Sequence, residues 1–90
     1  MKIKELLNHS GRWTQGYFAR AQSGSLCDAK SDEAVCWCLG GALQKCYGHL
    51  SERFEVYRKI SDKIGIIPIW NDDPTRTFDE VKSLLIELDI

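Results

Sequence analysis

The amino-acid sequence predicts a mainly α-helical fold, a compact bundle of about four helices with a short extended segment or small hairpin. Apolar residues recur at three- and four-residue steps in four separate stretches of the chain. Short polar residues that cap helices precede three of these stretches, and the one β-branched apolar run contains a proline. A chain of 90 residues has apolar material for one hydrophobic core, so we expect residues 1–90 to form a single domain.

The first helix is predicted over residues 2–9. Ile3, Leu6 and Leu7 have helical spacing, and Gly11 is typical of a residue that ends a helix. Residues 13–26 have a mixed pattern, because glycine and serine interrupt the helical spacing of the aromatic residues. This stretch is compatible with a helix or with extended and turning chain.

The second helix is predicted to span about 15 residues, from a cap at Ser31 or Asp32 to Gly48. Its apolar stripe consists of Val35, Cys36, Leu39, Ala42, Leu43 and Cys46. Gly40 and Gly41 lie inside this helix, where each glycine costs about 1 kcal/mol relative to alanine. That cost predicts close packing of the two glycines against another backbone.

The third helix is predicted to begin after a cap at Ser51 and to end at Gly65. Its inner stripe would consist of Phe54, Tyr57, Ile60, Ser61 and Ile64. Residues 66–70 follow as a β-branched apolar run, in which Pro68 lacks a backbone donor. This run predicts an extended segment or an edge strand.

The last helix has the clearest signals. Thr77 and Glu80 have the spacing of a capping box, in which each side chain accepts from the other residue's backbone N–H. The apolar stripe that follows consists of Phe78, Val81, Leu84, Leu85 and Leu88. Residues 71–74 before it have the composition of a turn.

Charge and composition restrict the expected partners. Twelve basic and 13 acidic residues give a net charge of -1, so no global field favours a phosphate backbone or an anionic membrane. The chain contains no apolar run of membrane-spanning length, and its start is too polar for a signal peptide. We therefore expect a cytoplasmic protein without a membrane partner, in which the four cysteines are thiols.

Cysteine and histidine are the first candidates for chemistry. The cysteines do not have the paired spacing of zinc modules, so the sequence predicts no metal and no other cofactor. A cysteine-dependent enzyme would use Cys36, near the predicted helix start, with His49 or His9 as base and Asn71 or Asp72 to orient the imidazole. A buried structural thiol at Cys36 is the favoured interpretation, and we assign no catalytic residue.

Binding to a macromolecule is the favoured hypothesis. The candidate binding residues are Trp37, Trp70, Asn71, Asp72 and Arg76. Trp37 lies beside the predicted apolar stripe of its helix, so it is expected to project sideways toward a groove or partner. In the turn, Arg76 is expected to pair with Asp72 or Asp73 while Trp70 seals the core beneath them.

A nucleic acid is the less favoured partner, and a protein is the preferred one. The basic residues that could contact phosphate are Arg53, Arg58, Lys59 and Lys63 on the third helix, joined by Arg12, Arg20 and Lys30. Acidic residues lie among them, whereas binding to phosphate requires clustered positive charge. A solvated helix face explains the same residues.

Several short motifs occur in order along most of the chain. They are Trp13-Thr14-Gln15-Gly16, Cys36-Trp37-Cys38-Leu39-Gly40-Gly41-Ala42-Leu43, Ile69-Trp70-Asn71-Asp72, Arg76-Thr77 and Glu80-Val81. This set resembles a family of small uncharacterised proteins found in phages and bacteria. The resemblance implies no activity, cofactor or catalytic residue; a phage setting suggests a host- or defence-modulating binding protein, for example an anti-CRISPR-like inhibitor.

Overall fold

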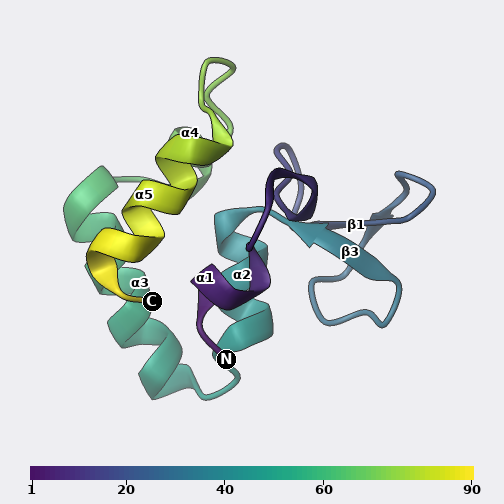
Figure 1. Ribbon diagram of the computed structural model, residues 1–90. Helices are drawn as coiled ribbons and strands as arrows, with labels where there is room; N and C mark the ends of the chain where they lie inside the picture. The colour runs from purple at the N-terminus through teal and green to yellow at the C-terminus, as the bar shows by residue number, and fades with distance from the viewer.

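The computed structural model describes residues 1–90 and has an α+β fold, so the predicted mainly α bundle of about four helices is wrong. Five helices accompany a three-stranded antiparallel sheet (Figure 1). The helices are α1 (Ile3–Leu6), α2 (Leu39–Cys46), α3 (Leu50–Ile64), α4 (Ile67–Asn71) and α5 (Phe78–Leu88), with a 3-10 turn at Ser10–Arg12. The strands are β1 (Ala19–Ala21), β2 (Leu26–Cys27) and β3 (Ala34–Trp37).

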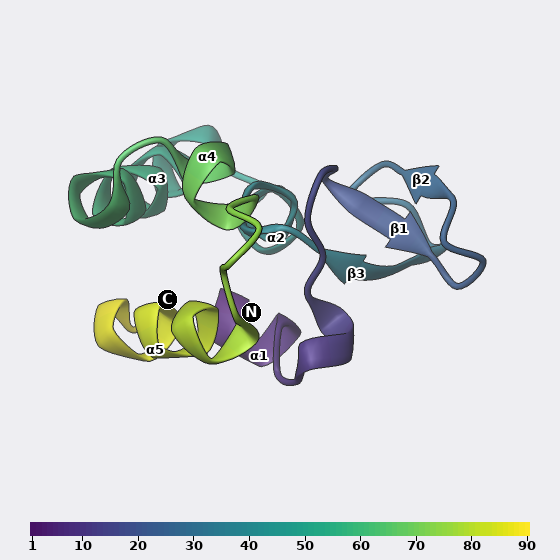
Figure 2. The same cartoon turned by 90° about the horizontal axis from the view of Figure 1, so that it is seen from above.

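The helices and the sheet occupy different ends of the molecule. In Figure 2, α3 and α4 lie on one side of the helical part and α1 and α5 lie on the other, with α2 next to the sheet. The two chain ends lie close together, because the backbone N–H of Lys4 donates to the carbonyl of Ile90 at 3.0 Å. The α1 segment therefore packs next to the end of α5.

The predicted second helix is in fact a strand followed by a shorter helix. Residues 34–37 pair with β1 in the strand order β2-β1-β3, with Arg20 opposite Cys36 and Ala19 opposite Trp37. The helix begins only at Leu39, with Cys38 as its N-cap. Valine and tryptophan favour a pleated, half-buried strand, and a short apolar run fits a strand or a helix equally well by its spacing alone.

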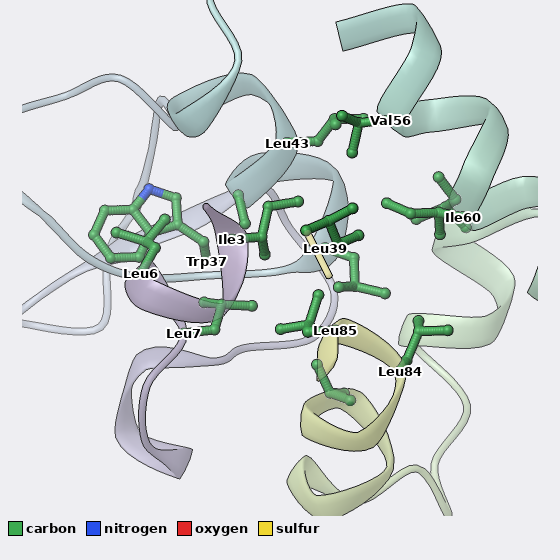
Figure 3. Close-up of a cluster of buried hydrophobic side chains, with 14 of the residues drawn as sticks. Ile3, Leu6, Leu7, Trp37, Leu39, Leu43, Val56, Ile60, Leu84 and Leu85 are labelled. Carbon is green, nitrogen blue, oxygen red and sulfur yellow. The ribbon is translucent and has the colours of Figure 1, made fainter. Parts of the chain in front are cut away.

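One hydrophobic core contains residues of the helices and of the strands β1 and β3 (Figure 3). Leu39 of α2, Ile60 of α3 and Leu85 of α5 are fully buried within it. Ile3 and Leu7 reach the same core from the α1 segment. The core therefore fixes α2 between the other helices, and α2 in turn fixes the segments that contact its N-terminus.

The inner face of α3 differs from the predicted stripe. Val56 and Ile60 are its buried residues, whereas Phe54 is 60% exposed and Tyr57 is 46% exposed. Apolar residues lie on two adjacent faces of α3, and only tertiary packing decides which face is covered. Ile60 is thus placed as predicted, and Phe54 and Tyr57 are not.

Residues 67–71 form the helix α4, so the predicted extended segment is wrong. Pro68 lies in the first turn of α4, where a backbone N–H has no partner within the helix and its absence costs nothing. The fixed φ angle of proline also suits a helix start. The short α4 ends at Asn71, and its last turn forms part of the site described below.

The last helix, α5, begins as predicted, whereas the first helix, α1, does not have its predicted length. The capping box of α5 is confirmed, because the Thr77 hydroxyl accepts from Glu80 N at 3.3 Å and a Glu80 carboxylate oxygen accepts from Thr77 N at 2.9 Å. The first helix is shorter than predicted, since α1 covers only Ile3–Leu6 and a 3-10 turn follows it. Both helices bury the predicted apolar residues Ile3, Leu6 and Leu85.

Candidate functional site

Asn71 is the buried polar residue of the structure, with 1% of its surface exposed. Its side-chain oxygen accepts from the indole Nε1 of Trp13 at 2.9 Å and from the backbone N of Leu39 at 3.0 Å. Its side-chain nitrogen donates to the Thr14 carbonyl at 3.2 Å and to Asp72 Oδ1 at 2.8 Å. The amide therefore uses all its hydrogen-bonding groups, as a buried polar group must to avoid a desolvation cost.

Residues 15 and 16 extend this network along the end of α4. Gln15 Nε2 donates to the carbonyls of Asn71 and Asp73, both at 2.9 Å. The backbone N of Gly16 donates to Asp72 Oδ1 at 3.0 Å. A helix leaves its last carbonyls without partners inside the helix, and Gln15 satisfies such groups here. The chain segment 13–16 is thus fixed against α4.

The N-terminus of α2 lies against the residue that precedes β1. The backbone N of Cys38 donates to the Phe18 carbonyl at 3.2 Å, and the Cys38 Sγ accepts from Gly41 N at 3.3 Å. A Cβ atom at Gly41 would lie 2.0 Å from the Phe18 carbonyl oxygen, so only glycine permits this approach. The predicted close backbone packing is confirmed at Gly41, whereas a Cβ at Gly40 would meet the Phe18 ring at an ordinary 3.6 Å.

These segments enclose a cleft of about 190 Å³, which we call the Asn71 cleft. It is lined by Gly16, Tyr17, Phe18, Cys38, Gly40, Ile67, Pro68, Asn71 and Asp72. The rings of Tyr17 and Phe18 meet edge to face at 5.7 Å, and the two residues are 43% and 46% exposed. The cleft is therefore mainly apolar, with Asp72 as the one carboxylate in its lining.

The matched family covers almost the whole of this architecture. The sequence model of the Family of unknown function (DUF6197) matches residues 2–87. The chain belongs to this family. No curated protein and no solved structure matches the chain. In this member of DUF6197, no helix has both the length and the apolar composition needed to cross a membrane.

The thiol in the cleft of this DUF6197 member is not activated. Burial raises the pKa of the Cys38 thiol, and the nearby Asp72 carboxylate also raises this pKa, while hydrogen bonds from the backbone of Gly41 and Gly40 lower it in part. The net shift is upward, so Cys38 is a neutral thiol near pH 7. The thiol thus adds a polarizable, uncharged surface to the cleft.

Arg76 and Trp70 form a separate cluster beside the cleft. The guanidinium of Arg76 lies 3.9 Å from the centre of the Trp70 ring and donates through Nε to the Trp70 carbonyl at 2.9 Å. Its Nη1 pairs with Glu80 at 2.8 Å, so the predicted pairing with Asp72 or Asp73 is wrong. Asp72 accepts instead from Asn71 and Gly16, and Asp73 accepts from Thr75.

Trp37 does not project toward a groove. It is 3% exposed, and its indole Nε1 donates to the Ala29 carbonyl at 2.8 Å. The guanidinium of Arg12 covers the ring at 5.1 Å. The prediction of a projecting Trp37 assumed a helix at this position, whereas strand β3 turns the side chain into the core.

The structure does not bring Cys36 and His49 together. Cys36 lies in β3, with its Sγ 3.9 Å from the Arg20 carbonyl oxygen, and His49 is the N-cap of α3. β3 and α3 lie on opposite sides of α2 in both views (Figures 1 and 2). Cys36 also does not lie at a helix start, because that position belongs to Cys38.

Several of the basic residues considered for phosphate binding have partners within the chain. Arg12, Arg20 and Arg53 each donate to backbone carbonyls, at distances of 2.9–3.4 Å. Lys63 pairs with Glu87 at 2.8 Å. These contacts use much of the donor capacity that a phosphate backbone would need.

Sequence reasoning missed the walls of the cleft. Tyr17, Phe18 and Pro68 have no local pattern that marks a site, because they become neighbours only through the packing of α2 against α4. The available signal was the ordered set of motifs, since residues 13–16, 38–41 and 70–72 all meet at Asn71. Asn71 and Asp72 were named from their turn chemistry, and both lie in the cleft.

Proposed function

We propose that the protein is a non-enzymatic protein-binding domain and that its partner docks over the Asn71 cleft. The observation that carries this proposal is the pair of half-exposed aromatic side chains, Tyr17 and Phe18, at the wall of a mainly apolar cleft. Large aromatic anchors in and around apolar pockets supply most of the energy of protein interfaces. A protein partner therefore suits this chemistry better than a phosphate backbone does.

The rigidity of the cleft supports the same proposal. Its floor is held by the buried amide of Asn71, and its wall is held by the contact between Gly41 and Phe18. A binding site that is ordered before its partner arrives avoids the entropy cost of ordering it on binding. The hydrogen-bond network therefore fixes the position of α4, although this helix is short.

Exposed apolar side chains also occur on α4 and at its N-cap, next in sequence to the lining residues Ile67 and Pro68. Ile66 is 64% exposed and Ile69 is 68% exposed. Exposed apolar side chains that gather around a cleft are typical of interaction surfaces. Ile66 and Ile69 therefore add exposed apolar surface on the element that forms one wall of the cleft.

Site-specific photo-crosslinking in natural host cells tests the proposal. Benzoylphenylalanine is placed at Tyr17 in one sample and at Tyr57 in the control, because both tyrosines are about equally exposed at 43% and 46%. We expect one protein to crosslink reproducibly from position 17 and not from position 57. No product at position 17, or the same products at both positions, would remove the support for docking at the cleft.

We further propose a host- or defence-modulating role in a phage setting, for example as an anti-CRISPR-like inhibitor. This part rests on the motif resemblance to small phage and bacterial proteins. Its test is phage plating on a host with active CRISPR immunity. Expression of the wild type should restore plaques, and expression of Gly40→Leu, which fills the cleft, should not. Equal plaque counts with and without the wild type would contradict this role.

The binding event is proposed to occur in the cytoplasm. All four cysteines, Cys27, Cys36, Cys38 and Cys46, are free thiols in the structure. Free thiols persist in reducing compartments. Labelling of thiols immediately after cell lysis should find all four reduced, and a disulfide at that stage would contradict the placement.

A further inference from the structure

We infer that the Asn71 cleft receives a lysine side chain presented by the protein partner. This inference rests on the proposed function and specifies the chemistry of its partner. A lysine has a long apolar stem and a compact positive head, and the cleft offers a complementary surface to each part.

The walls suit the stem of a lysine. Tyr17, Phe18, Ile67 and Pro68 are the large apolar side chains of the lining, and the thiol of Cys38 is neutral. The four methylene groups of a lysine gain free energy when such a surface removes them from water. The faces of the two aromatic rings also attract a cation that passes close to them.

The carboxylate of Asp72 suits the head of a lysine. All the hydrogen bonds of this carboxylate are made by Oδ1, which accepts from Asn71 Nδ2 at 2.8 Å and from Gly16 N at 3.0 Å. These two donors hold the carboxylate in place, and Oδ2 is left to accept from a ligand. Oδ2 of Asp72 can therefore accept one hydrogen bond from a lysine ammonium group.

No lysine or arginine lines the cleft, so the charge of Asp72 is not neutralised from within it. The guanidinium of Arg20 comes near Gly16, where its Nη2 would be 3.6 Å from a Cβ atom. Arg20 instead donates to Thr14 Oγ1 at 3.1 Å and to the Gln15 carbonyl at 3.2 Å. Asp72 is therefore the one charged side chain in the lining, and its carboxylate is complementary to a cation.

One free oxygen distinguishes lysine from arginine. A guanidinium forms its best carboxylate pairs with two parallel bonds, which require both oxygens. Because Oδ1 of Asp72 is already engaged twice, only a single strong bond remains for a ligand. An ammonium group is a point charge that needs only one such acceptor.

The test is a titration of ¹⁵N-labelled protein followed by NMR. The probes are N-acetyl-lysine N-methylamide and N-acetyl-norleucine N-methylamide, which have the same stem length and differ in the charged head. We expect the amides of Gly16, Phe18 and Gly40 to shift with both probes. The lysine probe should bind about fivefold more tightly, the gain of a partly exposed ion pair.

Two variants of equal net charge separate a specific ion pair from a general field. Asp72→Asn keeps an oxygen for the bonds from Asn71 and Gly16, and should abolish the preference for lysine over norleucine. Asp73→Asn is the matched control, because Asp73 accepts from Thr75 and does not line the cleft. This control should keep the full preference.

Four outcomes overturn the inference. Norleucine binding as tightly as lysine, or an unchanged preference in Asp72→Asn, would leave an apolar cleft without a lysine site, and the proposed function would stand. Tighter binding of the matching arginine probe would replace lysine by arginine. Failure of both probes to shift the cleft amides would overturn the lysine site, while crosslinking at Tyr17 decides the proposed function independently.

Discussion

At Asn71, one buried amide joins the chain segment 13–16, the start of α2 and the end of α4. Truncation to alanine leaves the indole of Trp13 and the backbone N of Leu39 without partners. We expect Asn71→Ala to lower the free energy of unfolding by about 3 kcal/mol, since an unsatisfied buried donor costs about 1–3 kcal/mol. Urea denaturation measures this, with the exposed Asn8→Ala as control. A loss below about 0.5 kcal/mol would show that the amide is not structural.

The thiols provide a second prediction at the level of residues. Burial raises the pKa of Cys46 to about 11, and it also raises the pKa of Cys38. Only the thiolate reacts with iodoacetamide, so both residues should be alkylated at least about tenfold more slowly than glutathione at pH 7.5. Peptide mapping of the native protein measures each rate. Alkylation of any cysteine faster than glutathione would restore the cysteine-dependent enzyme as a hypothesis.

Turn chemistry alone selects Asn71 and Asp72 from the sequence, but it does not reveal what they bind. The partners of Asn71 lie 58 residues away at Trp13 and 32 residues away at Leu39. Local reasoning assigns an asparagine in a turn to its own backbone. The roles of residues in the candidate site therefore depended on contacts that the sequence pattern does not encode.

Among the elements, α2 shows why two neighbouring glycines have different roles. Gly41→Ala would place a Cβ atom 2.0 Å from the Phe18 carbonyl oxygen, whereas Gly40→Ala makes only ordinary contacts. We expect Gly41→Ala to lose more than about 3 kcal/mol of stability or to fail to fold. Gly40→Ala should stay within about 1 kcal/mol of the wild type. Thermal unfolding followed by circular dichroism compares them, and equal stability of the two variants would contradict the close approach.

The elements that sequence reasoning predicted well are those with local end signals. The capping box placed the start of α5, because Thr77 and Glu80 satisfy each other's backbone donors. The strand β3 and the helix α4 were assigned wrongly, since short apolar runs have no such signals and their neighbours decide their form. Pro68 is compatible with the predicted extended segment or edge strand, but it stands in the first turn of α4.

For the whole molecule, the two ends of the chain meet through Asp89. Hydrogen bonds and charges from Lys2 and Lys4 lower the pKa of Asp89 to about 2. A carboxyl with a lowered pKa stabilises the fold above its unfolded pKa of about 4, and this contribution is lost as the pH falls toward 2. Asp89→Asn should therefore have a lower midpoint of thermal unfolding than the wild type at pH 6, and the difference should vanish near pH 2. An equal difference at both pH values would contradict this contact.

Asn is a suitable replacement at this position because Asp89 has a left-handed backbone with φ of 52°. Asparagine adopts this conformation at least as readily as aspartate does, so the substitution changes charge without adding backbone strain. The comparison therefore isolates the ion pairs with the two lysines.

The overall class of the fold was the hardest feature to predict. The positions of α3 and α5 follow from periodicity, but the sheet depends on pairing between residues such as Ala19 and Trp37, which are distant in sequence. Each strand has only two to four residues, which is too short for an alternating pattern to emerge. The sequence pattern therefore does not predict a three-stranded sheet.

The most direct test of the account measures the affinity of the crosslinked partner for the wild type, Gly40→Leu and Gly48→Leu. A leucine at Gly40 extends between Phe18 and Cys38 into the Asn71 cleft, and a leucine at Gly48 meets open space. We predict equal folding of both variants, at least about tenfold weaker binding by Gly40→Leu, and unchanged binding by Gly48→Leu. Unchanged affinity of a folded Gly40→Leu for the partner would contradict binding through the Asn71 cleft.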